Sequence, residues 1–441
     1  MDGDGDEDLV VTRTSENSIV IMWNDGTGNF PQDQWTAVTL EGNAKTVSLA
    51  IDDIDEDGKL DVAVLCAGGD FNDVVWVLWN GAWNEGGNVQ PVQIILGEDA
   101  LPDSIDTGDV LKVGNDLEGP IDVVVGGYAE WDWWDQDYIF VAHKETTRTF
   151  SEDVRSWFFP SYQGTEYIMV ADIMEDKPLA EIIGKSATVG YGDTENEWPK
   201  KWTPPIFYEA GKLDLGDLDN DGDLDFVSAN LDQEVINIAQ NWQGTLDGVA
   251  LPVSKKNMAV VMTHMDDDGN LDIAVALTKR KEDPGSNISL LRNTAANTEL
   301  SDEQHWLDAG AISTDKGNIR HLRAADLNGD GREDLFCSTD TGWVLVIMNE
   351  TPPNAPFRRG DSNNDGSLNI ADAIDVLGYL FGGEAPPSCK DAADANDDGK
   401  INLADAVYIL GYLFGGGPEP PAPFEQCGKD PTFDELWCLN Y

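Results

Sequence analysis

The stretch Asp217-Leu-Asp-Asn-Asp-Gly-Asp-Leu-Asp225-Phe-Val-Ser228 places acidic side chains at alternate positions of a short loop and then turns apolar. Asp, Asn and Gly are typical of tight turns, and the aromatic and β-branched residues after Asp225 favour a β-strand. The nonamer DxDxDGxxD that opens this stretch recurs along the first 350 residues. A motif repeated on this scale predicts a repeat architecture, in which each copy marks one structural unit.

Four copies of the nonamer keep the full frame. They begin at Asp53, Asp217, His264 and Asp326, and one of them carries histidine where the others carry aspartate. The chain opens inside a fifth copy, which lacks its first position and closes at Asp8. We therefore expect that Met1 is not the natural start, and that an upstream segment, behind a removed signal peptide, completes the first unit.

Two eroded copies lie between those at Asp53 and Asp217. The copy that closes at Asp122 loses its first carboxylate, and the copy from Asp172 to Glu181 loses its glycine and gains a residue. The acids that close the seven copies, spaced 44 to 62 residues apart, are Asp8, Asp61, Asp122, Glu181, Asp225, Asp272 and Asp334. Between them the chain forms short apolar runs, about four to a unit, as expected for the blades of a β-propeller.

The acidic loop between apolar strands, the turn Asn24-Asp-Gly-Thr-Gly-Asn-Phe30 and the blade-length period resemble the FG-GAP/VCBS family. Members of that family are seven-bladed propellers related to the head of integrin α-subunits. The resemblance covers roughly residues 1–350 and implies a mainly β fold. A Gly-Ala-Pro string is absent from this chain, so the VCBS branch is the more similar one.

Calcium is the cation that these loops suit. Oxygen donors at positions 1, 3, 5 and 9, with a backbone carbonyl at position 7, match the six to eight oxygens at about 2.3–2.6 Å that Ca²⁺ takes. The alternative is that Asp and Gly only form turns. Repetition of the donor spacing favours the metal, because clustered carboxylates repel one another without a cation. The predicted propeller ligands are Asp2, Asp4, Asp8, Asp53, Asp55, Asp57, Asp61, Asp217, Asp219, Asp221, Asp225, Asp266, Asp268, Asp272, Asp326, Asn328, Asp330 and Asp334.

Not every copy is expected to bind calcium equally. Histidine is a poor Ca²⁺ ligand, so the copy that begins at His264 is expected to bind more weakly. In the copy around Asp172, Lys177 replaces the glycine, and there a plain turn is the expected role. With the loop closed by Asp8 included, five propeller loops are expected to bind the ion.

A second duplication follows a proline-rich linker over residues 351–357. Within residues 358–441, the segment Asp361–Asp372 aligns with Asp394–Asp405 at an offset of 33, and each is a twelve-residue calcium loop of EF-hand type that leads into a helix. Apolar residues at helical spacing after each loop predict one buried face, formed by Ile370, Ala373, Ile374, Leu377, Leu380 and Phe381 and by their counterparts. The predicted ligands here are Asp361, Asn363, Asp365, Asn369, Asp372, Asp394, Asn396, Asp398, Asn402 and Asp405.

This C-terminal module resembles a type I dockerin. The resemblance implies a small all-α domain with Ca²⁺ as its cofactor and a cohesin-like domain as its partner. In dockerins, loop positions 10 and 11 are commonly a polar pair that contacts cohesin, whereas here they are Ile370-Ala371 and Leu403-Ala404. A divergent cohesin-like domain or another apolar surface is then the expected partner. The alternative is that these apolar pairs pack the two helices against each other.

Charge excludes two classes of partner. The formal net charge is −56, and such a surface repels nucleic acid and anionic membranes. Neither a membrane-spanning run nor a signal peptide is visible in the sequence. The resemblance to dockerin proteins and the three cysteines near the C-terminus, Cys389, Cys427 and Cys438, predict an extracellular or cell-surface protein. Cys427 with Cys438 predicts a small closed tail, and Cys389 with Cys438 is the alternative pairing.

The sequence favours a secreted calcium-binding scaffold that is not an enzyme, whose propeller binds polysaccharide or another cell-surface protein. The segment from Trp131 to Asp137 carries three Trp beside carboxylates, which suits either sugar stacking or packing between blades. The rival hypothesis is a dockerin-bearing lyase or glycosidase. No GxSxG or HExxH string and no carboxylate pair apart from the acidic loops supports that rival.

Overall fold

The computed structural model divides into two compact units. One contains Met1–His264 and Asn270–Asn349, and the other contains Glu350–Tyr441 with the short segment Met265–Gly269. The structure describes residues 1–42, 45–68, 73–80, 92–97, 101–108, 121–131, 134–142, 144–146, 149–150, 155–160, 167–173, 180–184, 188–191, 201–202, 210–242, 245–266, 268–278, 288–294, 300, 306–349, 356–383, 386–387, 389–428, 432, 436 and 438.

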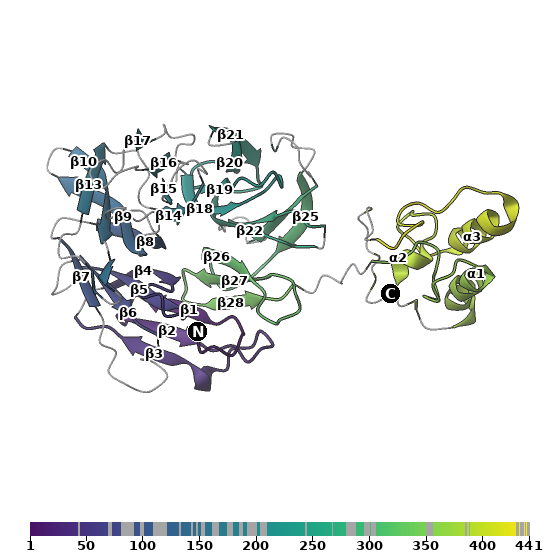
Figure 1. Cartoon of the computed structure of the whole chain (residues 1–441), viewed down its shortest axis with the longest axis horizontal. Coiled ribbons are helices and arrows are strands. Elements are labelled where there is room, and N and C mark those ends of the chain that lie inside the picture. Colours follow the sequence, from purple (N-terminus) through teal and green to yellow (C-terminus); the bar gives the residue numbers. More distant parts are fainter. Residues whose placement is uncertain are drawn as a thin grey trace. The chain divides into compact units, whose positions relative to one another are not determined.

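The first unit is a ring of seven antiparallel sheets, which confirms the predicted seven-bladed propeller (Figure 1). Blades 1 to 3 are built from β1 (Leu9–Arg13), β2 (Ser18–Met22) and β3 (Thr36–Thr39); β4 (Lys45–Asp52), β5 (Asp61–Ala67), β6 (Asp73–Leu78) and β7 (Val92–Gly97); and β8 (Leu101–Gly108), β9 (Asp122–Trp131), β10 (Trp134–Ala142) and β13 (Arg155–Pro160). A separate pair joins β11 (Lys144–Thr146) to β12 (Thr149–Phe150), and a short 3₁₀ turn, η1, spans Gln32–Gln34.

Blades 4 to 7 follow the same order. They are β14 (Ile168–Ala171), β15 (Glu181–Gly184), β16 (Thr188–Tyr191) and β17 (Lys201–Trp202); β18 (Ala210–Gly216), β19 (Asp225–Asn230), β20 (Val235–Trp242) and β21 (Thr245–Pro252); β22 (Asn257–Thr263), β23 (Asp272–Leu277), β24 (Ile288–Asn293) and β25 (Trp306–Ile312); and β26 (Ile319–Ala325), β27 (Asp334–Thr339) and β28 (Val344–Ile347). Blades 1 and 7 have three described strands each, and the other five have four.

Each acidic loop joins the first two strands of a complete blade. In blade 5 the strands pair so that Gly216 lies opposite Asp225, and in blade 7 Ala325 lies opposite Asp334. The closing acid is therefore the first residue of the second strand, where its side chain is buried. The same register recurs in blades 2, 3, 4 and 6, where Asp61, Asp122, Glu181 and Asp272 lie opposite the last residue of the first strand.

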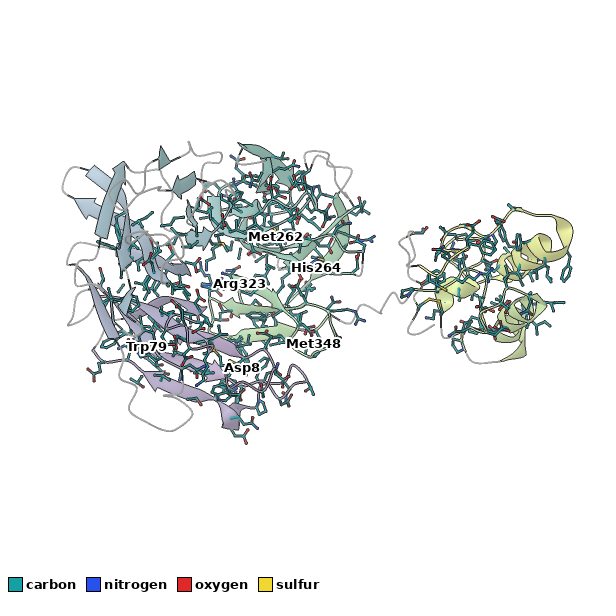
Figure 2. All side chains as sticks on the ribbon, viewed as in Figure 1. Asp8, Trp79, Met262, His264, Arg323 and Met348 are labelled. Carbon is teal, nitrogen blue, oxygen red and sulfur yellow. A yellow bond between two sulfur atoms is a disulfide. The ribbon has the colours of Figure 1, made fainter. Side chains whose placement is uncertain are left out.

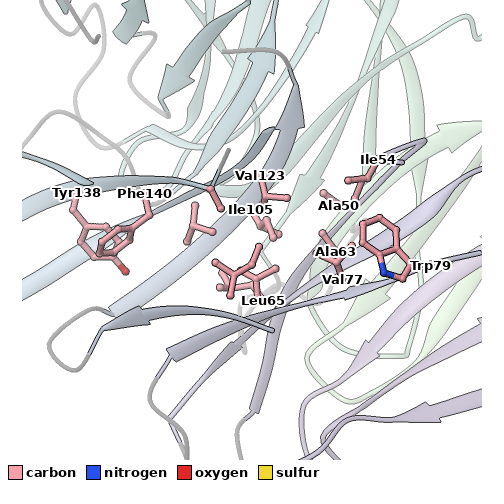
Figure 3. Close-up of a cluster of buried hydrophobic side chains, with 14 residues drawn as sticks. Ala50, Ile54, Ala63, Leu65, Val77, Trp79, Ile105, Val123, Tyr138 and Phe140 are labelled. Atoms are coloured by element: carbon pink, nitrogen blue, oxygen red, sulfur yellow. The ribbon is translucent and has the colours of Figure 1, made fainter. Parts of the chain in front are cut away.

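Apolar side chains fill the space between neighbouring blades. Between blades 2 and 3, Leu65 and Val77 meet Ile105, Val123 and their neighbours in one buried cluster (Figure 3). A second cluster lies between blade 1 and blade 7. It packs Leu327 of blade 7 against Leu9, Val20 and Met22 of blade 1, so side-chain packing closes the ring between the first and last blades. Burial of this kind stabilises a fold by roughly 25 cal/mol per Å² of apolar surface.

In blades 1, 2, 5 and 6, an asparagine at or near the end of a strand ties its own blade to the acidic loop of the preceding blade. In blade 6, the Asn293 backbone N–H donates to the closing acid Asp272 at 2.8 Å. The Asn293 side chain donates to the Leu218 carbonyl in the acidic loop of blade 5 at 2.7 Å. The equivalent side-chain bonds run from Asn24 to the Leu327 carbonyl, from Asn80 to the Met1 carbonyl and from Asn241 to the Ile173 carbonyl. We call this asparagine contact the interblade latch.

The second unit contains two helices that follow matching loops. α1 (Ile370–Leu377) continues into the π-helical turn η3 (Gly378–Gly382), a short α2 spans Lys390–Ala393, and α3 spans Leu403–Gly415. Ala373 and Val376 of α1 pack with Ala406 and Ile409 of α3. Fully buried Arg359 joins the second loop to the chain end, donating to the carbonyls of Asp394 and Ala422 at 3.0 and 3.1 Å.

Two sequence expectations need correction in this unit. Ile370, Ile374 and Phe381 are exposed and do not share the buried face with Ala373, because α1 and α3 meet through Ala373, Val376, Ala406 and Ile409. The disulfide joins Cys389 to Cys438 and leaves Cys427 exposed and free. The predicted pairing of Cys427 with Cys438 is therefore wrong, and the alternative pairing of Cys389 with Cys438 is confirmed.

The first test concerns the interblade latch. We expect Asn293→Ala to lower the free energy of unfolding by about 1–3 kcal/mol, because the buried Leu218 carbonyl and the half-buried Leu271 carbonyl lose this donor. Urea denaturation in calcium-containing buffer measures this. Exposed Asn29, which bonds only within its own turn to Asp25, supplies the matched control, since Asn29→Ala is expected to change stability by less than about 0.5 kcal/mol. Equal midpoints for both variants would remove the latch as a source of stability.

Candidate metal centres

The acidic loop of blade 5 gathers three carboxylates. One oxygen each from Asp217, Asp219 and Asp225 lies within 4.8 Å of the others. The loop turns because Asp217 accepts the backbone N–H groups of Asp221 and Gly222, both at 3.0 Å. Gly222 has φ +100°, a conformation that L side chains rarely adopt, which explains the glycine at position 6 of the nonamer.

The loop of blade 2 repeats this geometry. Oxygens of Asp53, Asp55 and Asp61 lie within 4.8 Å of one another, and Asp53 accepts N–H groups from Asp57 at 2.9 Å and Gly58 at 2.8 Å. Asp57 and Asp221, the acids at position 5, stand outside these triplets as the structure places them. The sequence had assigned all four acids of each loop to one ion.

The closing acid serves the backbone as well. Asp225 accepts the Leu218 N–H at 2.9 Å with one oxygen and the Asn241 N–H at 2.8 Å with the other. Asp61 does the same with Asp55 and Asn80, at 3.2 and 2.7 Å. This acid therefore fixes the turn and joins the ends of two strands through hydrogen bonds to the backbone.

Electrostatics favour a cation beside these acids. Burial, with the neighbouring loop carboxylates adding to it, raises the pKa of Asp225 to about 7 and that of Asp61 to about 6. A raised pKa means that the folded protein disfavours the charged form of the acid. A divalent cation offsets both the burial and the repulsion, and the all-oxygen donor set is the one that Ca²⁺ takes. The residues present thus fit calcium.

The remaining propeller loops differ in detail. In blade 7, Asp326 accepts the N–H groups of Asp330 and Gly331 at 3.1 and 2.8 Å, as in blades 2 and 5. In blade 6, Asp266, Asp268 and Asp272 follow His264, whose backbone N–H donates to Glu333 of blade 7 at 2.7 Å. His264 thus contacts the next blade. In blade 1, Asp4 and Asp2 are linked by a 3.2 Å bond, and Asp8 accepts the Met1 amine at 2.8 Å.

The eroded copies keep the closing acid. Buried Glu181 accepts the Ile173 N–H at 3.0 Å, the same backbone bond that Asp225 makes to Leu218. Asp122 is also buried at the start of β9. Residues 114–119 lie outside the described part of the chain, as do the side chains of the tryptophan-rich segment from Trp131 to Trp134.

The first loop of the C-terminal unit joins its ligands to a helix start. Asp361 accepts the N–H groups of Asp365 and Gly366 at 3.1 and 2.9 Å. Asn369 caps α1 by accepting the Ala371 N–H, and Asp372 accepts the Asn369 N–H at 2.7 Å. Positions 9 and 12 of the loop therefore form a capping box, so the loop and helix are built from the same residues.

The second loop repeats the first. Asp394 accepts the N–H groups of Asp398 and Gly399 at 3.2 and 2.7 Å, and Asn402 with Asp405 caps α3 in the same way. Burial raises the pKa of Asp405 to about 7 and that of Asp372 to about 6, with the facing loop acids adding to the shift. Asn363 and Asn396 occupy position 3 of their loops, and their role as ligands stays a prediction.

An exposed apolar stripe lies beside each loop. It is defined in the first half by Ile370, Ile374 and Phe381 and in the second half by Leu403, Val407 and Phe414. Ile374 is 60% exposed, Val407 is 58% exposed, and both phenylalanines are 72% exposed. Packing between the two helices therefore does not account for the apolar residues at loop position 10. We call these sets the two apolar stripes.

Sequence reasoning missed two features of the propeller. The interblade asparagines were visible only as the residue after an apolar run, and their partners lie as far away as 303 positions, between Asn24 and Leu327. Basic residues on the innermost strands, Lys212 on β18 and His321 on β26, also went unremarked, although their side-chain nitrogens lie 2.7 Å apart. No local motif marks either feature.

Comparison with known proteins agrees with both halves of this description. Residues 1–64 and 264–337 match the family described as FG-GAP-like repeat, and residues 359–414 match the Dockerin type I domain. No curated protein sequence shows significant similarity to the chain.

Similar solved structures include BBS1N in complex with ARL6DN (13% identity, 78% of this chain and 88% of that chain, TM-score 0.47). Others are the WD40 domain of Toxoplasma gondii coronin (13%, 77% and 77%, TM-score 0.38) and YCF48 from Cyanidioschyzon merolae (11%, 70% and 86%, TM-score 0.39). These scores are too low to bear on function. The seven sheets and the two family matches together identify a β-propeller with FG-GAP-like repeats, followed by a dockerin type I domain.

Proposed function

We propose that the chain is a secreted, calcium-stabilised adaptor, in which residues 1–350 form a binding propeller and residues 358–441 form a dockerin that docks on a cohesin-like domain. Dockerin domains bind cohesins and calcium, and proteins that carry them are typically extracellular. Among the described residues no helix is long and apolar enough to cross a bilayer. The single observation that carries the proposal is the pair of apolar stripes beside the two calcium loops.

Calcium has a structural role in this proposal. The four loops with a full nonamer and the loop closed by Asp8 hold propeller ions, and the loops from Asp361 and Asp394 hold two more. A bound ion neutralises carboxylates that the fold has already gathered, so its binding free energy adds to the stability of both units. Polysaccharide or another cell-surface protein is the class of partner proposed for the propeller.

The apolar stripes are the proposed cohesin-facing surfaces. Ile374 and Val407 occupy equivalent positions because the module is duplicated at an offset of 33. Each stripe follows the helix that its own calcium loop caps, so calcium fixes the orientation of the stripe. A partner that fits them presents an apolar surface, in place of the hydrogen-bonding groups that a polar pair would require.

Calcium stabilisation is tested by melting the full chain in excess EDTA and in millimolar Ca²⁺. Saturation at about one hundred times Kd is expected to add about 2.7 kcal/mol per site. Asp219→Asn is expected to reduce this gain while slightly raising the melting temperature in EDTA, because it removes one of the repelling carboxylates of blade 5. Asp232→Asn, at an exposed position outside the loops, is the control and is expected to change neither value. An unchanged melting temperature between EDTA and calcium contradicts the structural role.

Docking is tested with a panel of purified cohesin domains by surface plasmon resonance. Because the stripes are equivalent, Ile374→Glu or Val407→Glu alone is expected to leave one usable stripe and reduce affinity by at most a few-fold. The double variant is expected to lose at least about 100-fold, the cost of burying a charge in an apolar contact. Unchanged calcium-dependent helix content by circular dichroism shows that the double variant still folds. Full affinity in the folded double variant would rule the stripes out as the cohesin-facing surfaces.

A further inference from the structure

Basic side chains meet at the middle of the propeller. Lys212 comes from β18 of blade 5 and His321 from β26 of blade 7, and the Lys212 Nζ lies 2.7 Å from His321 Nδ1 and 2.9 Å from its Nε2. Blade 6 lies between these two blades, so the contact forms where the first strands of the blades converge on the axis of the ring. Arg323, two residues after His321 on β26, lies in the middle of the ring of blades (Figure 2).

The composition of the chain makes this gathering unusual. Lys and Arg number 27 against 83 Asp and Glu, so most cations have an acid available to them. Lys212 instead contacts a histidine and the ring of Tyr167, whose centroid is 5.8 Å from Nζ. Arg320 and Arg323 lie close enough to lower the pKa of Lys212 further, after burial, to about 7. Burial followed by Lys212 and the two arginines lowers the pKa of His321 to about 3, so this imidazole is neutral at pH 7 and accepts from Lys212.

The carboxylates nearest to this group already serve the backbone. Asp214 accepts the Met262 N–H of blade 6 at 2.7 Å, and Asp106 accepts the Val170 N–H of blade 4 at 2.7 Å. Burial raises the pKa of both acids, to about 6 for Asp106, and the charge of Arg323 offsets part of that rise in each. Arg323 therefore has two carboxylates near it, whereas the contacts of Lys212 are to His321 and Tyr167. These two acids therefore join neighbouring blades, and each gives an oxygen to a peptide N–H. Cations held together against their own repulsion lower stability unless an anion joins them.

We infer that Lys212, His321 and Arg323 form an oxyanion-binding site at the axis of the propeller, which takes the carboxylate of an acidic sugar. The surrounding blades enclose these groups closely enough to lower the pKa values of Lys212 and His321. His321 and Arg323 nevertheless keep exposed side-chain surface and Lys212 is half-buried, so a ligand can reach all three from solvent. Arginine offers a planar pair of donors that suits a carboxylate, and lysine adds a point charge. The flat ring of Tyr167 beside Lys212 favours a ligand that carries its oxyanion on a sugar ring. This site deepens the proposed function, because it gives the propeller a ligand class.

Isothermal titration calorimetry of the full chain in saturating calcium tests the site. The probes are galacturonate, polygalacturonate, inorganic sulfate and neutral galactose. We expect the acidic probes to bind and galactose not to bind. Tighter binding of galacturonate than of sulfate supports the sugar ring, and equal binding overturns that preference. Tighter binding per residue of polygalacturonate than of galacturonate identifies the polymer as the source of the carboxylate, and equal binding identifies the free sugar.

Two variants and one matched control locate the binding. Lys212→Met and Arg323→Gln are each expected to lower galacturonate affinity at least about tenfold, as for loss of a charge-assisted bond. Lys316→Met removes a lysine that stacks on Trp343 away from the three site residues, and is expected to change nothing. Since Lys212→Met also removes repulsion, the ligand-free melting temperature should rise by about 1–3 °C. Binding that survives both site variants, or no binding of any acidic probe at millimolar concentration, overturns the inference.

Proton uptake provides a readout that a structural role would not move. Among the described residues, the charged and titratable groups around Lys212 are His321, Arg320 and Arg323 of β26 and the ring of Tyr167 before β14. Arg323 also faces Asp214 of β18 and Asp106 of β8, and these acids have Glu333 and Asp52 as their own acidic neighbours. An anion raises the lowered pKa of Lys212, so binding near pH 7–8 should take up a proton, and affinity should fall as pH rises above 7. Titrations in buffers of different ionisation enthalpy measure this uptake. Absence of uptake in wild type overturns the role of Lys212.

The calcium-dependent melting shift in the same samples is expected to persist in Lys212→Met, so failure of this site is distinct from failure of the calcium proposal.

Discussion

The buried carboxylate that closes each acidic loop is the interaction on which the propeller depends. Asp225 illustrates it: one oxygen accepts the N–H of Leu218 inside the loop and the other accepts the N–H of Asn241 at the end of the third strand. One side chain thus sets both the shape of the turn and the position of a neighbouring strand. The asparagine held in this way then donates to the preceding blade, at the Ile173 carbonyl. The pair Asp225 and Asn241 consequently fixes two things: the alignment of strands within blade 5, and the alignment of blade 5 with blade 4.

This arrangement separates the fold from the metal. Glu181 retains the backbone bond to Ile173 in a copy that has lost its glycine, so a blade persists where the donor spacing is broken. A carboxylate that accepts two N–H groups still has lone pairs for a cation. Burial raises the pKa of Asp225, and the adjoining acids raise it further, which is the cost that calcium offsets. A repeat is therefore free to lose its ion before it loses its strand pairing.

The repeat made the fold predictable, because seven closing acids in register define seven blades without any long-range information. Of the five loops that the nonamer marked, those of blades 2 and 5 bring three carboxylates together in the described part of the chain. Contacts between distant segments were not predictable. Lys212 and His321 are 109 residues apart and meet only because the ring brings blade 5 and blade 7 to one axis. In the C-terminal unit, helical spacing assigned Ile374 to the same face as Ala373, whereas the close approach of α1 and α3 buries the alanine and leaves the isoleucine exposed.

The negative charge of the chain opposes the self-association that the two apolar stripes would otherwise favour. Six large apolar side chains exposed on one small unit would favour association between copies. A formal charge of −56 opposes that association, because like-charged copies repel at the distances where they first meet. Calcium at the loops beside the stripes neutralises charge next to them and leaves most of the charge of the chain in place. The apolar stripes are thus most available to a partner of low negative charge when calcium has ordered the helices that carry them.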